Sequence, residues 1–249
     1  MKKVFISGSI SIKKLPNCVK ESISKIVAQN MQILVGDADG IDTIVQNYCK
    51  SLGHSKVTVY SIYSMARYKA EGFDFKYIVP STSSKKERER QSEKDAAMTD
   101  DSDFSLIIWD GKSKGSYKNI LRALDQEKKA KVYLDWRDCF LESEKTTKLE
   151  IEYIYRENCG YTASEVVEYL QSEGEDFFPQ TRALNSFLLE NKIITKENNI
   201  YKPLSNYDHL FIIEMYRGKE KGIKFTNQFI NWLEKKIKEI KPPEQSSLF

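Results

Sequence analysis

The first 141 residues alternate between short apolar runs rich in β-type residues and longer segments with helical periodicity. The β-type runs cover residues 3–7, 31–35, 56–61, 104–109 and 131–134, and the helical segments cover residues 15–29, 41–52, 86–100 and 115–128. Alternation of this kind is typical of a parallel sheet whose strands are joined by crossover helices. We therefore predict an α/β domain over residues 1–141, with a Rossmann-like parallel sheet and helices on both faces.

Three of the expected strands end in small and acidic residues. One strand ends at Gly8 and Ser9, a second runs into the turn from Gly36 to Asp42, and a third runs into the segment from Asp110 to Ser116. The carboxyl ends of parallel strands meet at one edge of a sheet, where ligands bind in a common crevice. The helices that start there present unpaired N–H groups and a positive dipole end, which bind phosphate or carboxylate. We expect a nucleotide-like ligand, with candidate binding residues Gly8, Ser9, Gly36, Asp37, Ala38, Asp39, Gly40, Asp42, Arg90, Asp110, Gly111, Ser113, Gly115 and Ser116.

Individual residues in these turns have expected roles. Gly36 and Gly40 allow close approaches that a side chain would block, and Asp42 is expected to cap a helix over residues 43–51. Arg90 lies in the charged run of residues 85–94, where its guanidinium can clamp a phosphate. Charged runs are more often solvated helix faces, and we keep that interpretation for the rest of the run.

The long connection between residues 61 and 85 is unusual for a compact domain and predicts a flap over the cleft. Its aromatic residues can stack on a base, or they can pack the flap onto the sheet edge, which is the more common use. These residues are Tyr63, Tyr68, Phe73, Phe75 and Tyr77.

The residue types limit the chemistry. The two histidines, His54 and His209, lie in no ligand-like cluster, so we expect no metal site of the zinc type and no histidine-based hydrolysis. The four cysteines lack C-x-x-C spacing, which favours reduced thiols and a cytoplasmic location. A formal net charge of +3 neither requires nor excludes nucleic acid. The chain enters a strand directly, and no apolar run approaches the roughly 18 residues that span a bilayer, so we expect no leader and no membrane partner.

The pattern changes after residue 141. Residues 142–149 form a polar linker, and residues 150–241 are predicted to form a smaller, mainly α, winged-helix-like domain with C-terminal helices. Thr162 and Glu165 have capping-box spacing before a helix over residues 163–172. A helix over residues 179–192 and a β-hairpin over residues 192–204 follow. Helix, helix and hairpin is the winged-helix order.

In this interpretation the helix over residues 179–192 is the recognition helix. The candidate DNA-binding residues are Gln180, Thr181, Arg182, Asn185 and, on the wing, Lys196. Winged helices also bind proteins, so DNA and a protein partner both remain open. Two further helices are expected at residues 207–217 and 225–240, with an apolar stripe on the last that packs against the winged unit.

Residues 242–249 are expected to form a flexible tail with an apolar pair at its end. The tail resembles the bacterial sliding-clamp-binding pentapeptide Gln-x-x-Leu-Phe. The resemblance implies docking on a sliding clamp through Gln245, Leu248 and Phe249.

Residues 1–135 resemble the SLOG-type Rossmann superfamily, which includes DNA-processing protein A, the lonely-guy phosphoribohydrolases and YspA-like domains. The resemblance rests on Gly8 and Ser9, the turn from Gly36 to Asp42, the helix with Arg90 and Asp95, and Asp103 with the segment from Asp110 to Ser116. It implies binding of a nucleotide, a nucleotide-derived signal or a nucleic-acid phosphate, in a DNA-associated role in processing, replication or defence. It also implies a homo-oligomer.

Catalysis is disfavoured by one position. The glycoside-cleaving members place a glutamate in a Gly-Gly-x-Gly-Thr-x-x-Glu motif, and Asn119 stands there in this chain. A carboxamide cannot act as a nucleophile or general base, so we expect binding without turnover. The alternative is an N-glycosidase-type hydrolase acting on a nucleotide or NAD, with Asp37 and Asp110 as the weak catalytic candidates. These two and Asp39 can equally bind ribose hydroxyls or hold Mg2+ beside a nucleotide. A third hypothesis is a scaffold that works only through its winged unit and tail.

Overall fold

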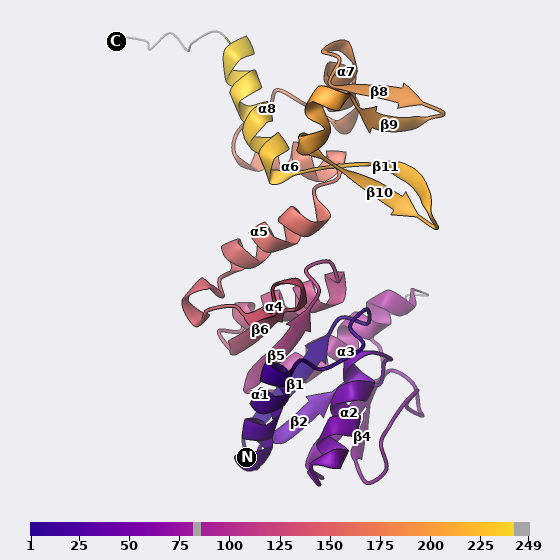
Figure 1. Ribbon diagram of the computed structural model, residues 1–249, viewed down its shortest axis with the longest axis vertical. Helices are drawn as coiled ribbons and strands as arrows, with labels where there is room; N and C mark the ends of the chain where they lie inside the picture. The colour runs from indigo at the N-terminus through magenta and orange to yellow at the C-terminus, as the bar shows by residue number, and fades with distance from the viewer. Residues whose placement is uncertain (82–85, 242–249) are drawn as a thin grey trace. The chain divides into compact units, whose positions relative to one another are not determined.

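The structure is a computed structural model that describes residues 1–81 and 86–241, with the side chain of Tyr216 left out (Figure 1). The chain divides into two compact units, Met1–Glu152 and Tyr153–Phe249. We call them the first and the second unit.

The first unit contains a seven-stranded sheet. Its strands are β1 (Lys3–Gly8), β2 (Gln32–Val35), β3 (Val57–Ser61), β4 (Asp74–Tyr77), β5 (Phe104–Trp109), β6 (Lys129–Leu134) and β7 (Cys139–Phe140). They lie in the order β4-β3-β2-β1-β5-β6-β7, and each neighbouring pair is parallel except β6 and β7. The predicted α/β class and parallel sheet are confirmed, while β4 and β7 were not expected from the sequence.

Helices cover both faces of this sheet, as predicted. They are α1 (Asn17–Ala28), α2 (Ile41–Ser51), α3 (Glu87–Asp101) and α4 (Lys114–Asp125). Successive side chains of a strand point to opposite faces. Val4 and Ile6 therefore join a buried cluster with residues of α1 and α2 such as Val45, whereas Phe5 packs with Met98 of α3 in a separate cluster.

Strand β1 lies at the topological switch point of the sheet. It pairs with β2 on one side and with β5 on the other, so the chain builds outward from β1 in two directions. The loops that follow β1, β2 and β5 all leave the same edge, and α2 and α4 start there. This is the place where open α/β sheets bind ligands.

The described part of the connection, residues 62–81, is fixed to the first unit by a few buried residues and by one edge strand. Ala70 and Phe73 are buried in the core with α1 and α2, and Tyr68 packs partly buried against them. Strand β4 adds the edge of the sheet, where Phe75 and Tyr77 are exposed. The described part of the connection is thus anchored to the sheet edge.

The second unit contains helices and two antiparallel hairpins. Its elements are α5 (Lys148–Cys159), which crosses the boundary between the units, α6 (Ala163–Ser172), α7 (Thr181–Glu190), β8 (Ile194–Glu197), β9 (Ile200–Pro203), β10 (Phe211–Tyr216), β11 (Lys219–Phe225) and α8 (Asn227–Ile240). The predicted capping box is confirmed: Thr162 Oγ1 accepts from Glu165 N at 3.3 Å, and Thr162 N donates to Glu165 Oε2 at 2.8 Å. The helix, helix and hairpin order over residues 163–204 is also present.

The predicted helix over residues 207–217 is wrong. A 3-10 helix, η3 (Ser205–Leu210), is followed there by β10, which pairs with β11. Arg217 and Gly218 have φ values of 50° and 76°, and two consecutive residues with positive φ form the tight turn that favours a hairpin. The predicted last helix is α8, and its stripe of Phe229, Leu233 and Ile237 is buried in the core of the second unit, as expected.

No helix in residues 1–81 and 86–241 combines the length and the apolar character needed to cross a bilayer. No disulfide joins the cysteines, all of which lie in the described residues. Burial raises the pKa of the Cys49 thiol to about 12, so this side chain stays protonated and packs in α2 as a small apolar group.

Candidate functional site

The loops after β1 and β5 are joined by hydrogen bonds across the switch point. The Oγ atoms of Ser9 and Ser116 lie 3.3 Å apart, and Asp110 N donates to Ser9 Oγ at 3.1 Å. Ser11 Oγ donates to Asp110 Oδ2 at 2.6 Å. Because Ser116 belongs to the first turn of α4, these bonds hold the start of α4 against the end of β1.

Asp110 organises the turn that leads into α4. Its Oδ1 accepts from Lys112 N at 2.9 Å and from Ser113 N at 2.7 Å. Burial raises the pKa of Asp110, but the hydrogen bonds from Ser11, Ser113 and Lys112 outweigh it and leave the pKa below its usual range. Asp110 is therefore an ionised structural acceptor whose two oxygens are both engaged.

Helix α2 starts differently from the prediction. Its N-cap is Gly40, with φ of 85°, and Asp42 lies inside the first turn, where its Oδ2 accepts from Ala38 N at 3.3 Å. The expected capping of a helix over residues 43–51 by Asp42 is wrong, because the helix begins at Ile41. A Cβ atom at Gly40 would lie 2.9 Å from both Cα and O of Ile10, so the β2 loop packs directly on the β1 loop.

Two helix starts without side-chain caps therefore flank the β1 loop. Gly40 has no side chain, and the Ser113 side chain makes no capping bond to α4. Gly115 in the first turn of α4 is exposed, and a Cβ there would have only Ser113 Oγ within 4 Å, at 3.9 Å. Exposed lysines lie in the same loops, and Lys13 Nζ donates to Ile10 O at 2.8 Å. This arrangement suits an anion, since the positive ends of both helix dipoles lie beside the β1 loop.

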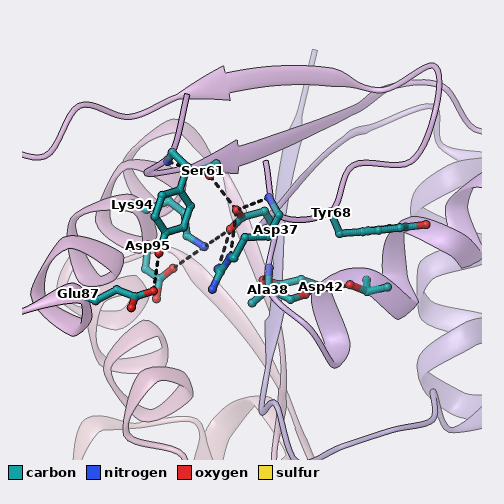
Figure 2. Close-up of polar contacts among 12 residues, drawn as sticks. Asp37, Ala38, Asp42, Ser61, Tyr68, Glu87, Lys94 and Asp95 are labelled. Carbon is teal, nitrogen blue, oxygen red and sulfur yellow. Dashed lines mark hydrogen bonds and ion pairs between the residues drawn. The ribbon is translucent and has the colours of Figure 1, made fainter. Parts of the chain in front are cut away.

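A second polar cluster surrounds Asp37 at the end of β2 (Figure 2). Asp37 has no exposed surface and lies among Ser61, Arg67 and Lys94. It accepts from Ser61 Oγ and Arg67 Nη2, each at 2.8 Å, and from Lys94 Nζ at 3.4 Å. Burial alone raises the pKa of Asp37, but the Arg67 hydrogen bond and the Lys94 charge lower it to about 2. Asp37 thus joins β3, the following connection and α3 to the end of β2.

Lys94 is the buried cation of this cluster, at 3% exposure. Its Nζ lies 3.4 Å from Asp37 Oδ1 and 4.0 Å from Asp95 Oδ1. A buried charge is costly unless it is paired, so Lys94 depends on these carboxylates. Burial raises the pKa of Asp95, against the charges of Lys94 and Arg122 and a hydrogen bond with Asn119. Asn119 is buried and also accepts from Arg122 Nη1 at 2.7 Å, so it belongs to an internal network.

Gly36 makes room for two members of the cluster. A Cβ atom there would lie 2.2 Å from Asp42 Oδ2 and 2.9 Å from Lys94 Nζ. Burial and the charges of Asp95 and Asp37 raise the pKa of Asp42 to about 6, although Lys94 opposes the shift. The carboxyl of Asp42 therefore changes charge closer to neutral pH than an ordinary aspartate does.

This pKa predicts that Asp42→Asn gains stability relative to the wild type as the pH rises. The folded-state pKa of about 6 lies above the model value of 3.8, so the unfolded state loses its proton first and the wild type loses stability between those pH values. We expect Asn to be more stable by about 2 kcal/mol near pH 7.5 and by much less near pH 3.5. Urea unfolding at both pH values measures this, with the exposed Asp39→Asn as the matched control. An equal difference at both pH values would contradict it.

The other expected ligand-binding residues differ in exposure and in their contacts. Asp39 is exposed, Ala38 is partly buried, and Gly8 packs so that its Cβ would lie 2.7 Å from Ile108 O. Gly111 has φ of 74° in the turn held by Asp110. Arg90 is partly buried in the first turns of α3, and the cation that reaches Asp37 is Lys94, one helical turn later. Lys94 also departs from the expectation of a solvated charged run.

Sequence reasoning missed the roles of Ser11, Ser61, Arg67 and Lys94. Ser61 had a usable signal, because it is a polar residue at the end of a buried strand on the same edge. Arg67 had none, since its contact with Asp37 depends on how the connection folds back. That connection also forms a hollow of about 460 Å3 lined by Arg67, Phe75 and neighbouring residues.

The expected DNA-binding residues lie on α7 and the β8–β9 hairpin of the second unit. Gln180, Arg182 and Lys196 are exposed, and Thr181 and Asn185 are partly buried. The expected clamp-binding residues Gln245, Leu248 and Phe249 lie outside the described residues.

Neither a metal-binding group nor a similar known protein helps to identify the ligand of this site. Over residues 1–81 and 86–241, no three His, Cys, Asp or Glu side chains are grouped so that they could hold a metal ion. Compared with known proteins, the chain matches no protein-family model and shows no significant similarity to a curated protein.

Proposed function

We propose that the first unit binds a nucleotide or a nucleotide-derived small molecule through its phosphate at the switch point of the sheet. The observation that carries this proposal is the pair of helix starts, α2 and α4, that lack side-chain caps on either side of the β1 loop. Each helix start is expected to favour an anion by about 0.3–1 kcal/mol, and both lie beside the same loop.

The surroundings of the helix starts support a phosphate ligand. The open Cβ position of Gly115 lets a ligand approach the backbone of α4 closely. Lys13 and Lys112 are exposed in the adjoining loops, Lys114 is exposed at the first position of α4, and all three supply positive charge. The hydroxyl of Ser11 is held in place by Asp110 beside the same loop.

Binding without turnover fits the carboxylates better than glycoside cleavage does. The oxygens of Asp37 and Asp110 are taken up by internal donors, and Asp37 has no exposed surface. A general acid, base or nucleophile has to reach the reacting atoms. Asn119, where the related enzymes carry a glutamate, is buried in its own network. We therefore propose a binding protein rather than an N-glycosidase.

The wider role remains part of the proposal. The SLOG-type resemblance of residues 1–135 and the exposed Gln180, Arg182 and Lys196 support a DNA-associated role. A homo-oligomer, Mg2+ bound with the nucleotide, a cytoplasmic location and a sliding-clamp partner are further expectations from the sequence.

The phosphate site is tested by Gly115→Glu. A glutamate in the first turn of α4 interacts favourably with the helix dipole, so the fold should tolerate it, but its charge repels a phosphate from the same N–H groups. We expect calorimetric titration with nucleoside monophosphates and ribose 5-phosphate to show binding to the wild type and at least roughly tenfold weaker binding to the variant.

Gly115→Ala is the matched control. It adds a Cβ atom without adding charge, so it should weaken binding clearly less than Gly115→Glu does. Equal affinity in Gly115→Glu and Gly115→Ala would place the ligand elsewhere.

A further inference from the structure

Trp136 is a partly exposed aromatic residue at the ligand-binding edge of the sheet. It lies in a 3-10 helix, η1 (Asp135–Arg137), that directly follows β6. Because β6 is parallel to β5, η1 leaves the sheet at the same edge as the Asp110 turn. Trp136 is 40% exposed, whereas Trp109 at the end of β5 has no exposed surface. A tryptophan left in solvent at such an edge forgoes hydrophobic free energy that burial would supply.

Contacts link Trp136 to the start of α4. The ring centroids of Trp136 and Trp109 lie 6.1 Å apart, at an interplanar angle of 84°. Trp109 Nε1 donates to Ser113 O at 3.2 Å, and Ser113 is the N-cap of α4. Trp136 is thus separated from the helix start by a single buried ring.

Charged side chains flank Trp136 in η1. Burial raises the pKa of Asp135, and the charges of Asp110 and Asp138 raise it further. On the other side, the guanidinium carbon of Arg137 lies 5.6 Å from the centroid of the Trp136 ring. An aromatic ring beside a guanidinium is a setting in which nucleic-acid bases stack.

Building on the phosphate site proposed above, we propose that Trp136 stacks on the base of a nucleotide whose phosphate lies at the start of α4. In a nucleotide the base is one sugar away from the phosphate, and Trp136 is one aromatic ring away from the N-cap of α4. Stacking tolerates any base, so this contact selects nucleotides over sugar phosphates without choosing among bases.

The test compares nucleoside monophosphates with ribose 5-phosphate on the full chain. For Trp136→Ala we expect roughly tenfold or greater loss of affinity for the monophosphates and unchanged affinity for ribose 5-phosphate. Trp136→Phe keeps an aromatic ring and should retain most of the affinity. Equal weakening of both ligands, or no weakening of either, would overturn the stacking role.

Tryptophan fluorescence distinguishes stacking from a purely structural role of Trp136, because a stacked base quenches the fluorescence of this residue directly. The chain has three tryptophans, and the third, Trp232, lies in α8 of the second unit. Monophosphates should quench the wild type and Trp232→Phe, and Trp136→Phe should bind with little quenching. Unaltered quenching in Trp136→Phe would overturn the proposal. If ribose 5-phosphate binds and Gly115→Glu abolishes that binding, the phosphate site is supported even when Trp136→Ala leaves monophosphate binding unchanged. If neither the monophosphates nor ribose 5-phosphate binds the wild type, both proposals fail.

Discussion

Replacing Asp37 with alanine is expected to destabilise the first unit by about 3–5 kcal/mol, because it removes the nearest counterion of a buried cation. The Lys94 side chain is 4% exposed and lies 3.4 Å from Asp37, and Arg67 binds the same carboxylate at 2.8 Å. Urea unfolding near pH 7 measures the loss. Exposed Asp39→Ala, two residues along the same turn, is the control and should cost far less.

The effect of Asp37 depends on pH in a direction that its pKa sets. The folded-state pKa of about 2 lies below the model value of 3.8, so the stabilisation is fully present above about pH 4 and is lost as the pH falls toward 2. The difference between the wild type and Asp37→Ala should shrink over that range. A difference that stays constant down to pH 2 would contradict the ion-pair explanation.

A double-mutant cycle measures the interaction energy between Asp37 and Lys94 apart from the effect of each single substitution. Lys94→Met alone leaves Asp37 with Arg67 and Ser61, and Asp37→Asn alone leaves Lys94 buried without its main counterion. The double variant should cost clearly less than the sum of the two single variants, because neither charge is then left unpaired. Additive losses would show that the two side chains do not interact.

Replacing Gly40 with alanine is expected to destabilise the first unit by about 3 kcal/mol. Gly40 has φ of 85°, a conformation that costs other residues on the order of 1–3 kcal/mol, and a Cβ there would also meet the backbone of Ile10 at 2.9 Å. The β1 and β2 loops would have to separate. The change in unfolding free energy, measured by urea or thermal unfolding, reports both contributions.

Gly72→Ala is the comparison variant. Gly72 has the same φ of 85°, but a Cβ there would have no heavy atom within 4 Å. We expect this variant to lose only about 1 kcal/mol, so a clearly larger loss in Gly40→Ala reflects the clash with Ile10 together with the ψ of −131° at Gly40. Similar losses in both variants would mean that the loops are not in close contact.

The alternating pattern of the first 141 residues predicts five strands of the sheet and the helices between them, and the structure contains all of these elements. Strands of this kind are buried on both faces, so their apolar runs are visible without knowledge of the partner strands. β4 escaped notice because all four of its residues are exposed and no apolar run marks it. The helix expected at residues 207–217 was wrong because its apolar residues also fit a strand that ends in a two-residue turn.

The candidate site was predictable in its position but not in its internal contacts. Strand-end loops carry glycine, serine and aspartate for local reasons, so Ser9, Gly40 and Asp110 can be picked out from the sequence. We expected these residues to contact a ligand, but Gly40 and Asp110 make contacts within and between the loops themselves. Whether a glycine makes room for a ligand or for a neighbouring chain segment depends on what lies opposite, which local sequence does not encode.

The sequence by itself determined that the first unit is a parallel α/β sheet whose loops gather at one edge, because hydrophobic periodicity is a local property of the chain. Only the tertiary structure decided which charges are buried together and which aromatic ring borders the helix start. Lys94 and Arg67 meet Asp37 from 57 and 30 residues away along the chain, and Trp136 reaches the α4 start through Trp109. Such pairings depend on the order in which the strands assemble, and β1 at the switch point brings them to one edge.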